Sequence, residues 1–214
     1  MQTKNLFPFE TKWNEPEFIS ILEKTTQMFN GSNKILDIGC GKGETTHYLT
    51  KKGFNTIGLE LTNFNPERKK LWKLMPDTKF ETYDGEEFPY QEQTFDGILL
   101  NNIFEHIREK DSFIAEVKRV LKSKGTVIFI LPTVEWKMSK LHKIPGKVLL
   151  GLKQRNFKLM FGAWFVHASN IYGRNYLKEW WDWVNWEIIV GKYFFVVESL
   201  SLKGETQLLL KVRK

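Results

Sequence analysis

The chain has 214 residues, 42% of them apolar, so it can bury the core of one α/β domain and is not intrinsically disordered. Its 32 Lys and Arg residues outnumber 25 Asp and Glu residues, giving a net charge of +7. The single cysteine, Cys40, excludes an internal disulfide and a cysteine-rich metal site. The sequence shows neither a secretory signal pattern nor an apolar run of the ~20 residues needed to span a membrane, so we expect a cytoplasmic protein.

Residues 1–31 are predicted to form an aromatic leader and a cap helix. The helix is expected to start near Asn14, because Pro16 suits a first helical turn and apolar residues then recur at helical spacing. Asn30-Gly31 is a stop signal. The helix is therefore expected to end a few residues before the first predicted strand.

The stretch from Ile35 to Glu44 predicts a strand, a sharp turn and the start of a helix. Glycines at alternate positions, Gly39, Gly41 and Gly43, follow the strand directly. Glycine allows positive φ and close approach of a ligand, and the first amides of a helix are unpaired. The pattern predicts a cradle for a nucleotide, although a glycine-rich turn without a ligand would have the same pattern.

Strands and helices then alternate. Further strands are predicted at Asn55–Glu60, Lys79–Tyr83, Phe95–Asn102 and Thr126–Leu131, and helices from Glu44 to about Lys52, from Asn65 to Met75 and from about Asp111 to Leu121. This alternation favours a parallel sheet whose ligands collect at the carboxyl ends of the strands. Asp37, Glu60 and Asp84 all fall at that edge. Glu60 lies 21 positions after Gly39, close to the ~20 typical of an acid that accepts hydrogen bonds from a ribose.

The positive charge is concentrated in one segment. Residues 136–178 contain no Asp or Glu and nine Lys or Arg residues, interleaved with aromatic residues. Residues 133–170 are predicted to be an insertion or lid within the domain. A helix from Tyr172 to about Val184 and a final antiparallel strand pair, Trp186 to Val197 and Gln207 to Val212, are predicted to follow.

The basic segment has three interpretations, in decreasing order of preference. It is the solvated side of a lid over a small-molecule pocket, a peripheral contact with an anionic membrane that presents a lipid-like acceptor, or an RNA-binding surface. The sequence does not decide among them, and it does not predict an oligomeric state.

The motifs resemble those of the class I S-adenosylmethionine-dependent methyltransferases, in the small-molecule branch that includes the quinone-biosynthesis enzymes. The first motif, acid-x-Gly-x-Gly-x-Gly, runs from Asp37 to Gly43, and further blocks follow in family order at Tyr83–Tyr90, Phe95–Leu100, Phe104–Ile107 and Arg119–Lys122. The resemblance implies one domain over residues 1–214, with a Rossmann-like, doubly wound, seven-stranded sheet, mostly parallel with an antiparallel terminal strand, plus a helical insertion. The turn Leu121–Gly125 departs from the usual Leu-Lys-Pro-Gly-Gly.

The resemblance also implies a cofactor, S-adenosylmethionine, with S-adenosylhomocysteine as product and no metal. Asp37 and the backbone of Gly39 to Gly41 would hold its methionine end, Glu60 its ribose and Asp84 its adenine. The implied cofactor contacts are Asp37, Gly39, Cys40, Gly41, Gly43, Glu60, Leu61, Asp84, Gly85, Glu86 and Asn101. For the acids, a solvated strand end or a local cap is the competing structural interpretation. In that family the helix after Asn14 covers the cofactor, but a helix that only packs on the sheet edge is an equal alternative.

The predicted activity is methyl transfer to a small or amphiphilic organic acceptor at oxygen, nitrogen or carbon. If the acceptor carries a hydroxyl, a base must take its proton, and His106 and His167 are the candidates, with packing as the alternative role for His106. The Asn-Pro-Pro-aromatic signature of DNA amine methyltransferases is absent after the fourth strand, where Asn101-Asn102-Ile103-Phe104 stands. The competing functional class is a catalytically silent module that binds RNA or an anionic membrane through its basic face.

Overall fold

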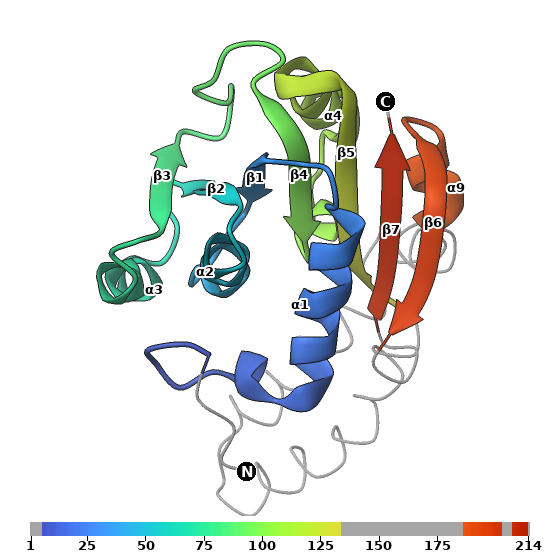
Figure 1. Cartoon of the computed structure of the whole chain (residues 1–214). Helices are drawn as coiled ribbons and strands as arrows, with labels where there is room; N and C mark the ends of the chain where they lie inside the picture. The colour runs from blue at the N-terminus through green and yellow to red at the C-terminus, as the bar shows by residue number, and fades with distance from the viewer. Residues whose placement is uncertain (1–5, 134–185, 203–206, 214) are drawn as a thin grey trace, which may run out of the picture.

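A seven-stranded sheet in the order β3-β2-β1-β4-β5-β7-β6 forms the centre of the molecule (Figure 1). The structure is a computed structural model that describes residues 6–133, 186–202 and 207–213. The strands are β1 Lys34–Ile38, β2 Asn55–Leu61, β3 Lys79–Tyr83, β4 Phe95–Asn101, β5 Leu121–Pro132, β6 Phe195–Leu202 and β7 Gln207–Arg213. The first five strands pair in parallel, and β7 is antiparallel to both β5 and β6. The predicted fold class is confirmed, and β7 occupies the penultimate position with β6 at the edge.

Helices cover both faces of the sheet (Figure 1). They are α1 Pro16–Met28, α2 Glu44–Lys51, α3 Pro66–Lys70, α4 Lys110–Val120 and α9 Trp186–Gly191, with 3-10 turns η1 Lys12–Asn14, η2 Leu71–Leu74 and η3 Phe104–His106. In β1, Ile35 packs in a cluster with α1 and α2, whereas Leu36 and Ile38 pack with α4 and α9. Because side chains alternate along a strand, Asp37 lies on the α1 and α2 face with Ile35.

The segment from Trp186 to Val197 was predicted as a strand, and this is wrong for its first half. Residues 186–191 form α9, and β6 begins only at Phe195. Trp186, Ile189 and Val190 are buried at helical spacing, and the Trp186 indole N–H donates a hydrogen bond of 2.9 Å to the Pro132 carbonyl. This contact with the end of β5 is a tertiary interaction, which local β propensity does not reveal.

Two further boundaries differ from the prediction. The helix expected from Asn65 to Met75 is α-helical only over Pro66–Lys70 and continues as η2. The fifth strand starts at Leu121 instead of Thr126, because Leu121 already pairs with Phe95 of β4. The predicted α4 therefore ends one residue earlier, at Val120.

Several predictions lie outside the described residues. These are the 133–170 insertion beyond Thr133, the helix from Tyr172 to Val184, the basic segment 136–178 and His167. The predicted domain boundaries, the membrane and RNA interpretations and the cytoplasmic location remain predictions. No helix in the described part of the chain is long and apolar enough to cross a membrane.

Candidate active site

The direction of strand addition reverses between β1 and β4, because β2 and β3 lie on one side of β1 while β4 and β5 lie on the other. In open α/β sheets, ligands bind at the carboxyl ends of the strands near such a switch point. Asp37 lies one residue from the end of β1, Glu60 one residue from the end of β2, Asp84 directly after β3 and Asn101 at the end of β4. The fold therefore brings these four predicted residues to one edge of four neighbouring strands.

The glycine loop between β1 and α2 is packed against side chains from two neighbouring segments, the turn after β4 and strand β3. All three of its glycines have positive φ: 71° at Gly39, 57° at Gly41 and 91° at Gly43. A Cβ on Gly39 would collide with the Ile103 side chain, and one on Gly43 would lie 2.5 Å from the Phe80 ring. Glycine is therefore required at Gly39 and Gly43 both for backbone conformation and for space.

Asp37 is a buried carboxylate beside this loop. Its side chain accepts a hydrogen bond of 2.7 Å from the Thr46 hydroxyl at Oδ2, and the residue is 1% exposed. Within the described part of the chain, its Oδ1 atom is buried and has no hydrogen-bond partner. Burial raises the pKa of Asp37 to about 7, and the charges of Glu60 and Glu44 add to the increase. A cationic group next to Oδ1 would remove the cost of this orphaned atom.

Glu60 is also buried, and it supports the glycine loop. Its Oε2 accepts a hydrogen bond of 2.8 Å from the Gly41 amide, and its Oε1 accepts one of 2.9 Å from the Leu61 amide. A carboxylate has about four acceptor positions, so Glu60 keeps capacity to accept hydrogen bonds from a ligand diol. Leu61, another predicted contact, lies at the end of β2 and contributes its amide to this arrangement.

The residues after β3 form an exposed turn. Asp84 accepts a hydrogen bond of 3.0 Å from the Glu86 amide, and Gly85 between them has a φ of 103°. Asp84, Gly85 and Glu86 are all exposed, so their polar groups face solvent. They stand at the end of β3, on the far side of Glu60 from Asp37.

Asn101 and His106 lie at the end of β4. The Asn101 amide donates a hydrogen bond of 2.9 Å to the Thr45 hydroxyl at the start of α2. His106 lies in η3, and its Nε2 is 3.8 Å from Glu105 Oε1. Cys40 is buried in the glycine loop, and burial raises the pKa of its thiol, which agrees with a packing role.

Sequence reasoning missed the side chains that hold the glycine loop from outside. The Trp72 indole N–H donates a hydrogen bond of 3.1 Å to the Gly41 carbonyl. The Trp72 ring stacks on the Phe80 ring, with 4.7 Å between the ring centroids. Phe80 in turn occupies the space beside Gly43. Thr46, the partner of Asp37, was missed as well. The helical pattern predicted Trp72 only as part of a helix, and no local signal indicates its contact with residues 31 positions earlier.

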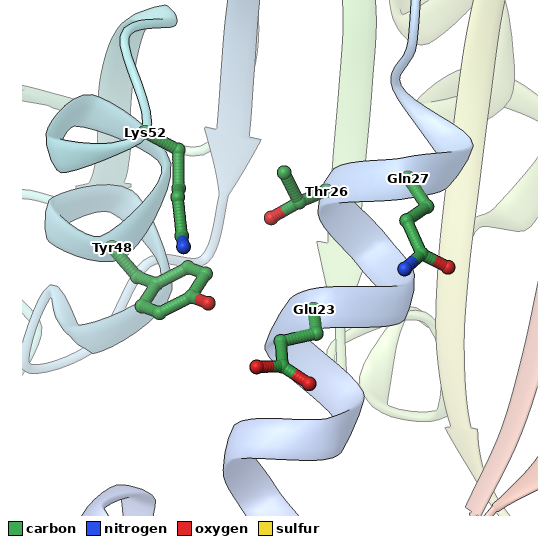
Figure 2. Close-up of a pocket in the computed structure, with 5 residues that line it drawn as sticks. All are labelled: Glu23, Thr26, Gln27, Tyr48 and Lys52. Atoms are coloured by element: carbon green, nitrogen blue, oxygen red, sulfur yellow. The ribbon is translucent and has the colours of Figure 1, made fainter.

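A polar cavity of about 370 Å³ lies between α1 and α2, lined by Glu23, Thr26, Gln27, Tyr48 and Lys52 (Figure 2). None of the predicted cofactor residues lines it. The cavity is therefore separate from the site predicted at the strand ends. Among the described residues, no group of three or more His, Cys, Asp or Glu side chains is arranged to hold a metal ion.

Comparison with known proteins gives one family for the central part of the chain. Residues 36–129 match the family described as "Methyltransferase domain". Ajmaline N-methyltransferase from Rauvolfia serpentina is 32% identical over 149 residues, which cover 64% of this chain and 48% of that protein. The ubiquinone biosynthesis O-methyltransferase from Bartonella quintana is 31% identical, over 55% of this chain and 48% of the relative. The chain spans about half the length of the curated relatives it matches.

Two solved methyltransferase structures share the fold of the described residues. A SAM-dependent methyltransferase from Aquifex aeolicus has a TM-score of 0.60 at 17% identity, covering 92% of this chain and 93% of its own. The 1,6-didemethyltoxoflavin-N1-methyltransferase from Burkholderia thailandensis, solved with S-adenosylhomocysteine, has a TM-score of 0.57 at 15% identity, covering 94% and 80%. Residues 36–129 thus match the methyltransferase domain family, and the fold built around them is shared with solved S-adenosylmethionine-dependent methyltransferases.

Proposed function

We propose that the chain transfers a methyl group from S-adenosylmethionine to a small or amphiphilic organic acceptor. The observation that carries this proposal is the buried carboxylate of Asp37, whose Oδ1 has no partner among the described residues, beside a loop of positive-φ glycines. The family match over residues 36–129 supports the same activity. The names of the relatives include N- and O-methyltransferases, so the acceptor atom is left open.

The residues present fit this cofactor by charge and by shape. Asp37 is suited to the ammonium of the methionine end, because a cation there would stabilise its orphaned oxygen. The cofactor carboxylate was predicted to bind the backbone of Gly39 to Gly41, but the amides of Gly39 and Cys40 donate to the Leu59 carbonyl and that of Gly41 donates to Glu60. The start of α2, where the helix dipole favours an anion, is therefore the better position for this carboxylate. Glu60 would accept hydrogen bonds from the ribose, and Asp84 from the adenine amino group. Cys40, Gly43, Leu61, Gly85, Glu86 and Asn101 would supply backbone contacts and packing.

When bound, S-adenosylmethionine supplies a methyl group on a positively charged sulfur. The main task of the protein is to align the acceptor with that methyl group and to exclude water. We assign His106, in η3 after β4, as the group that takes a proton from the acceptor. His167 stays a second candidate from the sequence.

Calorimetric titration with S-adenosylmethionine tests the cofactor, and S-adenosylhomocysteine release with a panel of phenols, amines and quinols tests transfer. We expect one binding site per chain with micromolar affinity and release with at least one acceptor class. Absence of binding by the folded protein would contradict the proposal. Binding without release from any acceptor would favour the silent binding module instead.

A further inference from the structure

Glu105 places a buried carboxylate next to the exposed imidazole of His106. The Glu105 side chain is 4% exposed, whereas the His106 side chain is 75% exposed, and Glu105 Oε1 lies 3.8 Å from His106 Nε2. The second oxygen, Oε2, is buried without a hydrogen-bond partner among the described residues. Burial raises the pKa of Glu105 to about 7. An anion at this position therefore gains from any cation that forms beside it.

The turn that carries both residues is fixed against the glycine loop and the core. Asn102 has a φ of 52°, which turns the chain at the end of β4, and its amide donates a hydrogen bond of 2.8 Å to the Ile130 carbonyl. The next residue, Ile103, occupies the space beside Gly39. Phe104 is fully buried, with its ring 5.2 Å from that of Phe129. Glu105 and His106 are thus held close to the cradle proposed for the cofactor.

Among the described charged groups around Glu105, the His106 imidazole is the potential cation that lies close to its carboxylate. The positive charge of Lys110 lowers the Glu105 pKa, but this effect is smaller than that of burial. The Lys110 ammonium donates a hydrogen bond of 2.9 Å to the Ile107 carbonyl and lies 5.4 Å from the centre of the Phe104 ring. Arg108 and Glu109 are exposed in the following loop and at the N-cap of α4. In the described part of the chain, His106 is the titratable group found at ion-pair distance from Glu105.

We propose that Glu105 is a positioning residue that stabilises the imidazolium formed when His106 takes a proton from the methyl acceptor, and that the acceptor therefore carries an O–H or N–H group. This inference rests on the proposed function and extends it to the substrate class. It assigns to Glu105 the role that a carboxylate has beside a catalytic histidine elsewhere, which is to favour the protonated ring.

In the transfer step, the acceptor oxygen or nitrogen forms a bond to the methyl carbon, and the carbon–sulfur bond breaks with its electron pair staying on sulfur. The acceptor proton moves to His106 Nδ1, while Nε2, which faces Glu105, carries the other ring proton. The sulfur becomes a neutral thioether, and the positive charge moves to the imidazolium beside Glu105. A carbon acceptor without an O–H or N–H group would make no use of this pair.

The first test measures the His106 pKa by NMR titration of its ring protons in the wild-type protein, Glu105→Gln and Glu109→Gln, with His106→Asn to assign the signal. We expect Glu105→Gln to lower the His106 pKa by at least half a unit. Glu109→Gln, which removes an exposed acid three residues after His106, should lower it by less than half that amount. Equal His106 pKa values in the wild-type protein and Glu105→Gln would overturn the inference, whatever the cofactor result.

The second test uses phenol and secondary-amine acceptors together with calorimetry. We expect Glu105→Gln to reduce kcat about tenfold and to move the acidic limb of the pH profile to lower pH, with the affinity for S-adenosylmethionine unchanged and partial recovery in Glu105→Asp. A wild-type pH profile in Glu105→Gln would overturn the positioning role, and turnover restricted to carbon acceptors would overturn the acceptor class. If the wild-type protein does not bind S-adenosylmethionine, the proposed function is refuted instead. The NMR titration would still show whether Glu105 and His106 interact.

Discussion

Replacing Asp37 by Asn should change how cofactor affinity depends on pH. Asp37 is buried, its Oδ1 has no partner among the described residues, and its pKa is raised to about 7, so it is largely protonated at about pH 5.5. A ligand ammonium next to it would lower this pKa, and binding would release a proton. Asn keeps an oxygen that can accept the hydrogen bond from Thr46, but it cannot release a proton.

The size of the effect follows from the raised pKa. If the pKa of Asp37 in the complex falls below about 5, the affinity of the wild-type protein should rise about 30-fold between about pH 5.5 and pH 8, which is about 2 kcal/mol. Asp37→Asn should remove this rise and bind more weakly at about pH 8. Calorimetry in buffers of different ionisation enthalpy measures both the affinity and the protons released.

The matched control is Asp77→Asn, which removes an acid whose side chain is 69% exposed and pairs with Lys51 at 2.8 Å. This variant should keep the pH dependence of the wild-type protein. Parallel affinity curves for Asp37→Asn and the wild-type protein would refute the reasoning, because they would show that the Asp37 carboxyl does not change its protonation when the cofactor binds.

Three further predictions concern affinity and stability. Glu60→Ala should weaken S-adenosylmethionine binding by about 1–3 kcal/mol through loss of charge-assisted hydrogen bonds, and unchanged calorimetric affinity would place the ribose elsewhere. Trp72→Phe keeps a ring to stack on Phe80 but removes the hydrogen bond to the Gly41 carbonyl, so affinity should fall about threefold to tenfold, whereas equal affinity would show that the loop does not need this bond. Because burial raises the pKa of Glu105 from its ordinary value of 4.5 to about 7 in the folded protein, its contribution to folding stability is present at low pH and is lost as pH rises from about 4.5 to 7. Glu105→Gln should therefore be more stable than the wild-type protein to urea by about 2–3 kcal/mol at about pH 8 and equally stable near pH 4.5, and equal stability at both pH values would contradict the burial of an ionised carboxylate.

The parts of the fold set by local pattern were predictable from the sequence. The apolar run into Gly39, Gly41 and Gly43 identified β1 and the start of α2, and the β-α alternation predicted a parallel sheet. The alternation also placed Glu60 and Asp84 at strand ends. These features depend on residue type and spacing within about 20 positions, which a sequence shows directly.

The parts set by distant contacts were not predictable. Trp186 and its neighbours form a helix instead of a strand, and the Trp186 indole donates a hydrogen bond to the carbonyl of Pro132, 54 positions earlier. The contact of Trp72 with Gly41 likewise spans 31 positions. Glu105 was overlooked because its importance comes from burial, and a glutamate in a polar turn gives no sign of burial in the sequence.

The central claim is that S-adenosylmethionine lies across the carboxyl ends of β1, β2 and β3. A crystal structure of the chain with S-adenosylhomocysteine tests it most directly. We predict the ligand ammonium within hydrogen-bonding distance of Asp37 Oδ1, the ribose hydroxyls on Glu60 and the adenine amino group on Asp84. A ligand bound elsewhere, or one that leaves the Asp37 and Glu60 carboxylates without contact, would contradict the account.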